Sequence, residues 1–135
     1  MIDIENDVFT AVASALRTAF PGIFVAGEYV RQPPSFPTVT VIENGNSVTQ
    51  RYRTLNIENA ASVMFEVNVY SNKPDGKKSE AKAIAAVIDD VFSGIGFTRT
   101  MKNQVANLND ASIYRIVCRY EAVVDKDLWV YNNTL

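Results

Sequence analysis

The clearest pattern along the chain is the alternation of strongly apolar residues with more polar ones over residues 62–70. A period of two is typical of a β-strand with one buried face, because successive side chains point to opposite sides of a sheet. A second alternation over residues 112–124 predicts another long strand. The side chains expected to face the core are Val63, Phe65, Val67 and Val69 in the first strand and Tyr114, Ile116, Cys118, Tyr120, Ala122 and Val124 in the second.

Two amphipathic helices are predicted, over about residues 3–20 and 75–93. In both segments apolar residues recur at intervals of three or four, which places them on one helical face. Pro21-Gly22 ends the first helix, and we expect Gly94 to cap the second. The apolar positions are Ile4, Val8, Val12, Leu16 and Phe20 in the first helix and Ala81, Ile84, Ala85, Ile88, Val91 and Phe92 in the second.

Weaker patterns predict further strands between the first helix and residue 62. Residues 23–30 suggest a short strand in which Gly27 marks a bulge or a close backbone approach. Residues 31–37 contain three prolines, which cannot donate hydrogen bonds to a sheet, so an ordered connecting loop is expected there. Residues 38–43 alternate again and predict a second strand.

The remaining segments are predicted from turn signals. Asn44-Gly45 suggests a tight turn, after which residues 47–55 would return as the second arm of a hairpin. In the C-terminal half, residues 97–106 are expected to be extended and residues 107–110 to turn. Residues 127–131 could add a short final strand.

Runs of strand without regular alternation of strand and helix favour an α+β fold. We expect a two-layer sandwich over residues 1–135, built as a single domain with a mostly antiparallel sheet and two helices packed on one face. The buried helix face, represented by Val8, Val12, Leu16, Ile84 and Ile88, should pack against the apolar side of the sheet. Apolar residues make up 47% of the chain and charged residues 21%, as is usual for a globular domain.

The composition removes several classes of function. The chain has no histidine, so it lacks the commonest general base and metal ligand. Its net charge of −2 does not provide the positive surface that binding to duplex DNA or to an anionic membrane usually needs. Cys118 is the single cysteine and cannot form an internal disulfide, which suits a reducing cytoplasm. The acidic first residues do not resemble a signal peptide, and no apolar run approaches the roughly 20 residues of a membrane span.

A search for catalytic or ligand-binding motifs leads to structural interpretations. Cys118 lies in the middle of a predicted strand, where a buried core thiol is expected. Asp89-Asp90 and residues 107–110 are the only acidic clusters visible in the sequence, and neither has the spacing of a calcium loop. Gly94-Ile95-Gly96 follows a helix instead of opening one, so it marks a helix end and not a phosphate loop. We therefore expect no catalytic residue, no cofactor, no metal site and no enzymatic activity.

Two groups of residues are candidates for contacts with partner proteins. Arginines and a tyrosine gather in a predicted hairpin arm and on the outward face of the last long strand, where the alternative is a solvated sheet face. Large aromatic residues near the C-terminus either belong to an interface or close over the protein's own core. The candidate contacts with other subunits or with a tube are Arg51, Tyr52, Arg53, Arg115, Arg119, Trp129 and Tyr131.

Several segments resemble the small tail terminator, or tail completion, proteins of long-tailed bacteriophages. The sequence segments that carry the resemblance are Glu66-Val67-Asn68-Val69-Tyr70-Ser71-Asn72-Lys73, Lys77-Lys78-Ser79-Glu80-Ala81-Lys82-Ala83-Ile84, Gly96-Phe97-Thr98-Arg99 and Ile113-Tyr114-Arg115-Ile116-Val117. Residues 29–37 are similar to the family as well. The resemblance extends over most of the chain. It rests on local sequence similarity and on the order of helices and strands, because the family has no short invariant motif.

The resemblance implies a structural protein that forms a ring, usually a hexamer, on the completed tail tube. Such a ring stops the addition of tube subunits and offers a surface for joining the DNA-filled head. The implied partners are copies of the chain itself, the tail tube protein and a head-completion or neck protein, while DNA crosses the lumen without being read. The implied location is the head–tail junction of the virion, after assembly in the host cytoplasm. The alternatives are a head-completion or neck adaptor and, in another class, a small non-catalytic ligand-binding domain.

Overall fold

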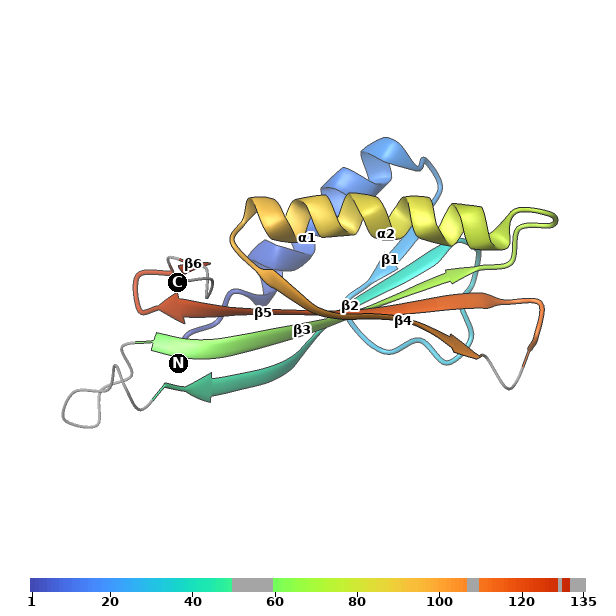
Figure 1. The fold of residues 1–135 in the computed structure, drawn as a ribbon. Coiled ribbons are helices and arrows are strands. Elements are labelled where there is room, and N and C mark those ends of the chain that lie inside the picture. Colours follow the sequence, from blue (N-terminus) through green and yellow to red (C-terminus); the bar gives the residue numbers. More distant parts are fainter. Residues whose placement is uncertain (50–59, 107–109, 129, 132–135) are drawn as a thin grey trace.

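The structure, a computed structural model, describes residues 1–49, 60–106, 110–128 and 130–131. Two helices lie against one face of a six-stranded sheet, as Figure 1 shows. This arrangement confirms the predicted α+β two-layer sandwich. In chain order the elements are α1 (Glu5–Ala19), β1 (Phe24–Ala26), β2 (Thr38–Val48), β3 (Ala60–Ser71), α2 (Lys77–Gly94), β4 (Thr98–Ala106), β5 (Tyr114–Asp125) and β6 (Val130–Tyr131).

The sheet is antiparallel except at one edge. Its strand order is β1-β2-β3-β5-β4, and β6 pairs with β5 beyond the end of β4. Only β1 runs parallel to its neighbour β2. Parallel neighbours need a crossover connection, which residues 27–37 supply on the side of the sheet away from α2 (Figure 1). This crossover is the loop that the three prolines predicted.

The predicted turn at Asn44-Gly45 is wrong, because β2 continues through it to Val48. A two-residue hairpin turn of the Asn-Gly type requires positive φ at both residues, and neither Asn44 nor Gly45 has positive φ. Instead the register shifts between Glu43 and Gly45, which is a β-bulge in the pairing with β3. The hairpin partner of β2 is therefore β3, and residues 47–48 belong to β2 itself. The rest of the predicted arm, residues 50–55, lies outside the described residues.

Other boundaries shift less. The first predicted strand is shorter than expected, since β1 covers only Phe24–Ala26 and Gly27 follows it without a bulge in the pairing. A Cβ atom at Gly27 would lie 3.6 Å from the Phe9 ring, an ordinary contact, so the expected close approach is modest. The extended segment before residue 106 and the short final strand are confirmed as β4 and β6.

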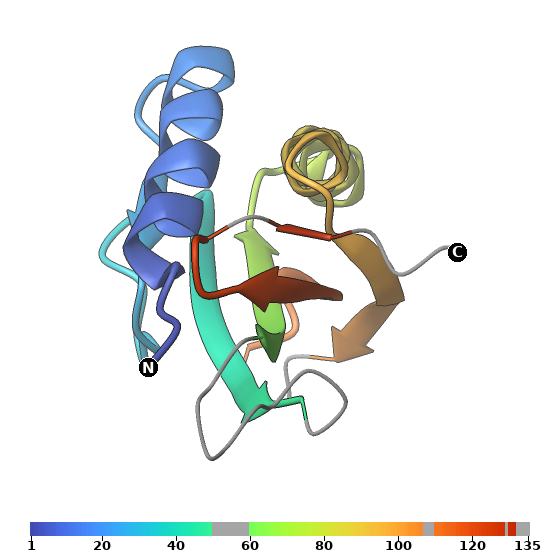
Figure 2. The ribbon, with the colours of Figure 1, turned by 90° about the vertical axis from the view of Figure 1, so that its left-hand side faces the viewer.

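The hydrophobic core lies between the helices and the sheet, with the predicted faces turned inward. Val12, Leu16, Ile84 and Ile88 have no solvent exposure, and Cys118 is 2% exposed. The helix residues and the strand residues Val63, Phe65, Val67, Val69, Ile116 and Cys118 belong to one continuous cluster. The predicted packing of both helices on this face is thereby confirmed, and Figure 2 shows them side by side above the strands.

An aromatic cluster occupies the part of the core under α2. The Phe92 and Tyr120 rings stack with their centroids 4.2 Å apart. Phe97 meets both Phe92 and Phe65 edge to face, at centroid distances of 5.4 and 5.6 Å. Offset-stacked and edge-to-face contacts are the favourable geometries for aromatic pairs. The cluster therefore ties α2 to β3, to β5 and to the residue that precedes β4.

The glycine that ends α2 is Gly96 and not Gly94. Gly94 is the last helical residue, and Ile95 is the C-cap between them. Gly96 has a φ of 95°, a left-handed conformation that favours glycine. Its N–H donates to the Ser93 carbonyl at 3.1 Å and the Phe97 N–H donates to the Phe92 carbonyl at 2.9 Å. These two bonds and the accompanying contact between the Phe92 and Phe97 side chains form a Schellman motif. The helix thus ends within one residue of the predicted position, but the glycine that caps it lies two residues after the one predicted.

We expect Gly96→Ala to lower the free energy of unfolding by about 1–3 kcal/mol. An alanine there would be strained by the positive φ, and its Cβ would lie 3.1 Å from Val130 Cγ1. Gly94→Ala is the matched control, because Gly94 is helical and a Cβ there would meet nothing within 4 Å. This control should gain up to about 1 kcal/mol. Chemical denaturation of both variants measures the difference, and equal stabilities would contradict the assignment of the cap.

Candidate functional site

The side of the sheet away from the helices, here called the helix-free face, carries a row of polar side chains across β3 and β5. The register pairs Glu66 with Arg119 and Tyr70 with Arg115. Directly paired residues on antiparallel strands point to the same face. The structure therefore brings both predicted arginines of β5 beside polar partners on β3. The sequence placed these residues on outward faces but could not show that the two strands are neighbours.

Arg115 is held firmly on this face. Its Nε and Nη2 atoms donate to Asn68 Oδ1 at 3.0 and 2.7 Å, and its guanidinium carbon lies 5.5 Å from the centre of the Tyr70 ring. Asn68 has no solvent exposure although no helix covers it. Burial raises the pKa of Tyr70, and the charge of Arg115 opposes that rise. Two of the three guanidinium nitrogens of Arg115 thus donate inside the subunit.

Arg119 occupies the exposed end of the same row. Its Nη2 atom lies 3.3 Å from Glu66 Oε2, with 44% of the arginine side chain and 12% of the glutamate side chain exposed. Glu66 also accepts hydrogen bonds from the amides of Asn44 and Asn68, at 3.3 and 3.2 Å. The charge of Arg119 is therefore balanced locally, while its side chain remains accessible to a partner.

The other predicted contact residues are placed only in part. Arg51, Tyr52, Arg53 and Trp129 lie outside the described residues. For Tyr131 the structure describes the backbone, which pairs with Val123 in the β5–β6 ladder. The structure therefore brings together Arg115 and Arg119 among the predicted residues, and the role of the others stays a prediction.

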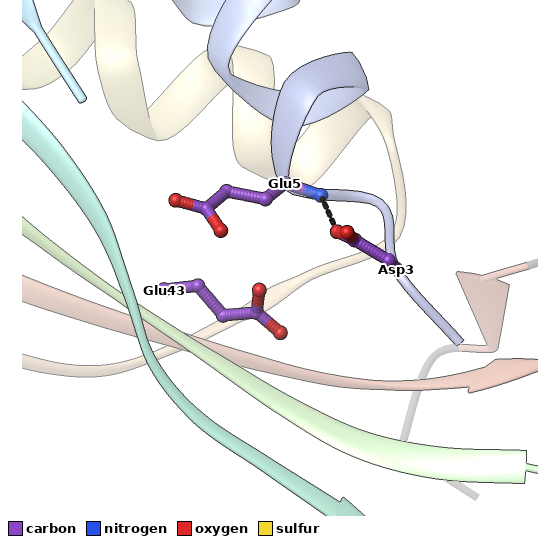
Figure 3. A group of neighbouring side chains, drawn as sticks. All are labelled: Asp3, Glu5 and Glu43. Carbon is purple, nitrogen blue, oxygen red and sulfur yellow. Dashed lines mark hydrogen bonds between the residues drawn. The ribbon is translucent and has the colours of Figure 1, made fainter. Parts of the chain in front are cut away.

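A cluster of carboxylates that the sequence did not reveal lies where the N-terminus of α1 meets β2. Asp3, Glu5 and Glu43 each offer an oxygen atom, and these atoms all lie within 4.8 Å of one another (Figure 3). The three residues surround a shallow depression that Met1 and Asn46 also line. The expectation that residues 89–90 and 107–110 held the only acidic clusters was wrong, because Glu43 reaches the other two only through the packing of α1 beside β2.

The electrostatics of this acidic cluster are unfavourable for the charged form of Glu43. Partial burial raises the pKa of the Glu43 carboxyl, and repulsion from Glu5 and Asp3 raises it further. Asn46 opposes the shift, because its amide donates to Glu43 Oε1 at 2.8 Å. The same amide donates to the Ile2 carbonyl, also at 2.8 Å, and so holds the N-terminal segment beside β2. The cluster is a concentrated negative patch. Among the described residues, it is the group of acidic side chains whose oxygens lie close enough together to hold a cation.

The remaining candidates are buried or have hydrogen-bond partners inside the subunit. Cys118 is buried, and burial raises the pKa of its thiol, which disfavours the nucleophilic thiolate. Asp89 accepts hydrogen bonds from Arg99 Nη1 and the Tyr120 hydroxyl, both at 3.0 Å. Asp110 accepts bonds from the backbone and hydroxyl of Ser112 and shapes the start of β5. In the described part of the chain, neither helix is long and apolar enough to cross a membrane.

A fold of this kind occurs in a chain of known structure. A chain of the virion of a native gene transfer agent (GTA) particle superposes with a TM-score of 0.63, covering 90% of this chain and 94% of that chain, at 16% sequence identity. The sequence profile of the family described as tail completion protein gp17 matches residues 7–125. The chain belongs to this family, which confirms the resemblance found in its sequence. No curated protein matches the chain significantly.

Family membership defines the general role of the protein. It is a structural tail completion protein of a phage.

Proposed function

We propose that the protein is a tail terminator that forms a closed ring at the end of the finished tail tube. The observation that carries this proposal is the match of the tail completion family over residues 7–125. Occupation of the growing end would block the addition of further tube subunits. The exposed side of the ring would then present the surface on which the head is joined. In this proposal residues 1–135 act as a single domain, without catalysis and without a cofactor.

The sheet is suited to repeated association around an axis. Its two lateral edges are different, with β1 and β2 at one edge and β4 at the other. Contacts between unlike patches are heterologous and close into a ring when the rotation permits. We propose a hexamer whose partners are the tail tube protein on one side and a head-completion or neck protein on the other. Arg51, Tyr52, Arg53, Trp129 and Tyr131 stay proposed contacts, together with the accessible Arg119.

Passage of DNA through this ring would not involve recognition. Arginine side chains often bind phosphate, but both arginines of the helix-free face already have a partner inside the subunit. Arg115 donates to Asn68, and Arg119 is paired with Glu66. The net charge of −2 adds no general attraction for DNA. A surface of this kind would let DNA slide without retaining it.

Tail length in a phage lacking the gene tests the proposal. We expect tails that overgrow or fail to join heads, as seen by electron microscopy of lysates, and we expect the gene supplied in trans to restore normal virions. Normal-length tails attached to empty heads would instead favour a head-completion or neck adaptor. Unaltered virions would contradict both roles.

A further inference from the structure

At each of the two lateral edges of the sheet, part of the outermost strand has no second strand beside it within the described residues. At one end, β4 pairs with β5 on one side only. At the other end, the three-residue β1 pairs with Thr38–Thr40, so the following part of β2, residues 41–48, has a strand neighbour on the β3 side only. Unpaired strand edges present rows of backbone donors and acceptors that can pair with another chain.

The strand directions make these two edges compatible. Because β2, β3, β5 and β4 are successively antiparallel, β4 runs opposite to β2. A second copy placed beside the first, with its helices on the same side, would therefore bring its β4 antiparallel to β2 of the first. Antiparallel pairing of this kind would continue the sheet from one copy to the next without reversing either face.

The charges at the two edges are opposite and lie on the same side of the sheet. In β4, Arg99 and Lys102 pair with the core-facing residues Tyr120 and Cys118, so both cations are on the helix side. The Arg99 contact with Asp89 of α2 agrees with this placement. No acidic residue occurs in β4. At the β2 edge, Glu43 pairs with the core-facing Phe65 and is likewise on the helix side, where it meets Asp3 and Glu5.

This arrangement leaves the isolated subunit with an unfavourable feature that a neighbour would relieve. Three carboxylates within 4.8 Å of one another repel each other in the monomer. A cation brought to them by an adjacent subunit would remove that repulsion in the assembly alone. Electrostatic complementarity of this type selects the correct partner and the register of pairing. The acidic cluster and the cations of β4 would then be two halves of one contact, in which Arg99 also keeps its pairing with Asp89 of its own subunit.

We propose that, in the ring, β4 of each subunit pairs antiparallel with residues 41–48 of the next, with Lys102 and Arg99 facing Asp3, Glu5 and Glu43. This inference rests on the ring of the proposed function, and it specifies which surfaces of the subunit form the interface. It also assigns a partner, a second copy of the chain, to the acidic cluster.

Charge reversal tests the contact. Lys102→Glu should weaken association at least tenfold, as measured by light scattering of the purified protein or, if that is monomeric, by binding to purified tail tubes that lack it. The double variant Lys102→Glu with Glu43→Lys should recover most of the loss, because the pair is restored in the opposite sense. Lys82→Glu is the matched control, since Lys82 is an exposed residue of α2 and the charge change is the same. We expect the control to associate like the wild type.

Hydrogen–deuterium exchange of the wild-type assembly provides a second readout that does not depend on a variant. Peptides covering β4 and residues 41–48 should become protected on ring formation, while peptides of α2 should not. A ring whose strand edges stay unprotected, or a Lys102→Glu variant that associates like Lys82→Glu, would overturn the edge contact and leave the terminator role intact. Failure of the wild-type protein to form any ring, alone or on tubes, would contradict the proposed function and this inference together.

Discussion

Phe65→Ala should lower the free energy of unfolding by about 3–5 kcal/mol. Phe65 has no solvent exposure, and its strand, β3, is flanked on both sides by long strands. Its ring lies 5.9 Å from that of Phe92 and 5.6 Å from that of Phe97, measured between centroids. Truncation would remove the transfer free energy of the ring and leave a cavity that β2 and β5 cannot collapse to fill. A shift of the denaturation midpoint at unchanged slope measures the loss.

Two further substitutions define what this result means. Phe65→Leu keeps most of the volume and should cost about 1.5 kcal/mol or less. Ser62→Ala changes an exposed residue of the same strand and should stay within about 0.5 kcal/mol of the wild type. If Phe65→Ala cost no more than Ser62→Ala, the aromatic cluster would not be the packed centre that the distances indicate.

Asn68→Ala should lower the free energy of unfolding by about 2–3 kcal/mol, although Asn68 is polar and lies away from the main core. The side chain is fully buried and accepts both hydrogen bonds of the Arg115 guanidinium. Its own amide donates to Glu66. Removing it would leave a half-buried charge without its partner, and such a group costs more than a hydrogen bond between neutral groups contributes. Denaturation measured as for Phe65→Ala gives the value.

Arg119→Ala is the matched comparison for this prediction. Arg119 belongs to the same row, but 44% of its side chain is exposed to water, and an ion pair with one exposed partner contributes only about 1 kcal/mol or less. We therefore expect the fold to tolerate Arg119→Ala far better than Asn68→Ala. A similar cost for both variants would show that the row acts as one unit and not as a buried anchor with an exposed end.

The sequence alone determined the two helices, the two long strands β3 and β5, and the faces that they bury. The alternation in residues 62–70 and 112–124 and the helical spacing of Val12, Leu16, Ile84 and Ile88 identified inward-facing side chains that the structure confirms. These patterns are local, since a strand or helix with one apolar face has to bury that face whatever its neighbours are. The sequences of several segments also indicated the family, which the match over residues 7–125 confirms.

Only the tertiary structure decided which residues meet. Asn44-Gly45 reads as a turn by itself, but pairing with β3 continues through it and a bulge absorbs the irregularity. The sequence suggested Gly94 as the cap of the second helix, but the packing of Phe97 on Phe92 places the left-handed glycine at Gly96.

The same holds for the charged groups of the surface. Arg115 meets Asn68 across 47 residues of chain, and Glu43 meets Asp3 and Glu5 only because α1 packs beside β2. No local signal carries such contacts, because they follow from strand order and register, which the burial of the whole core selects.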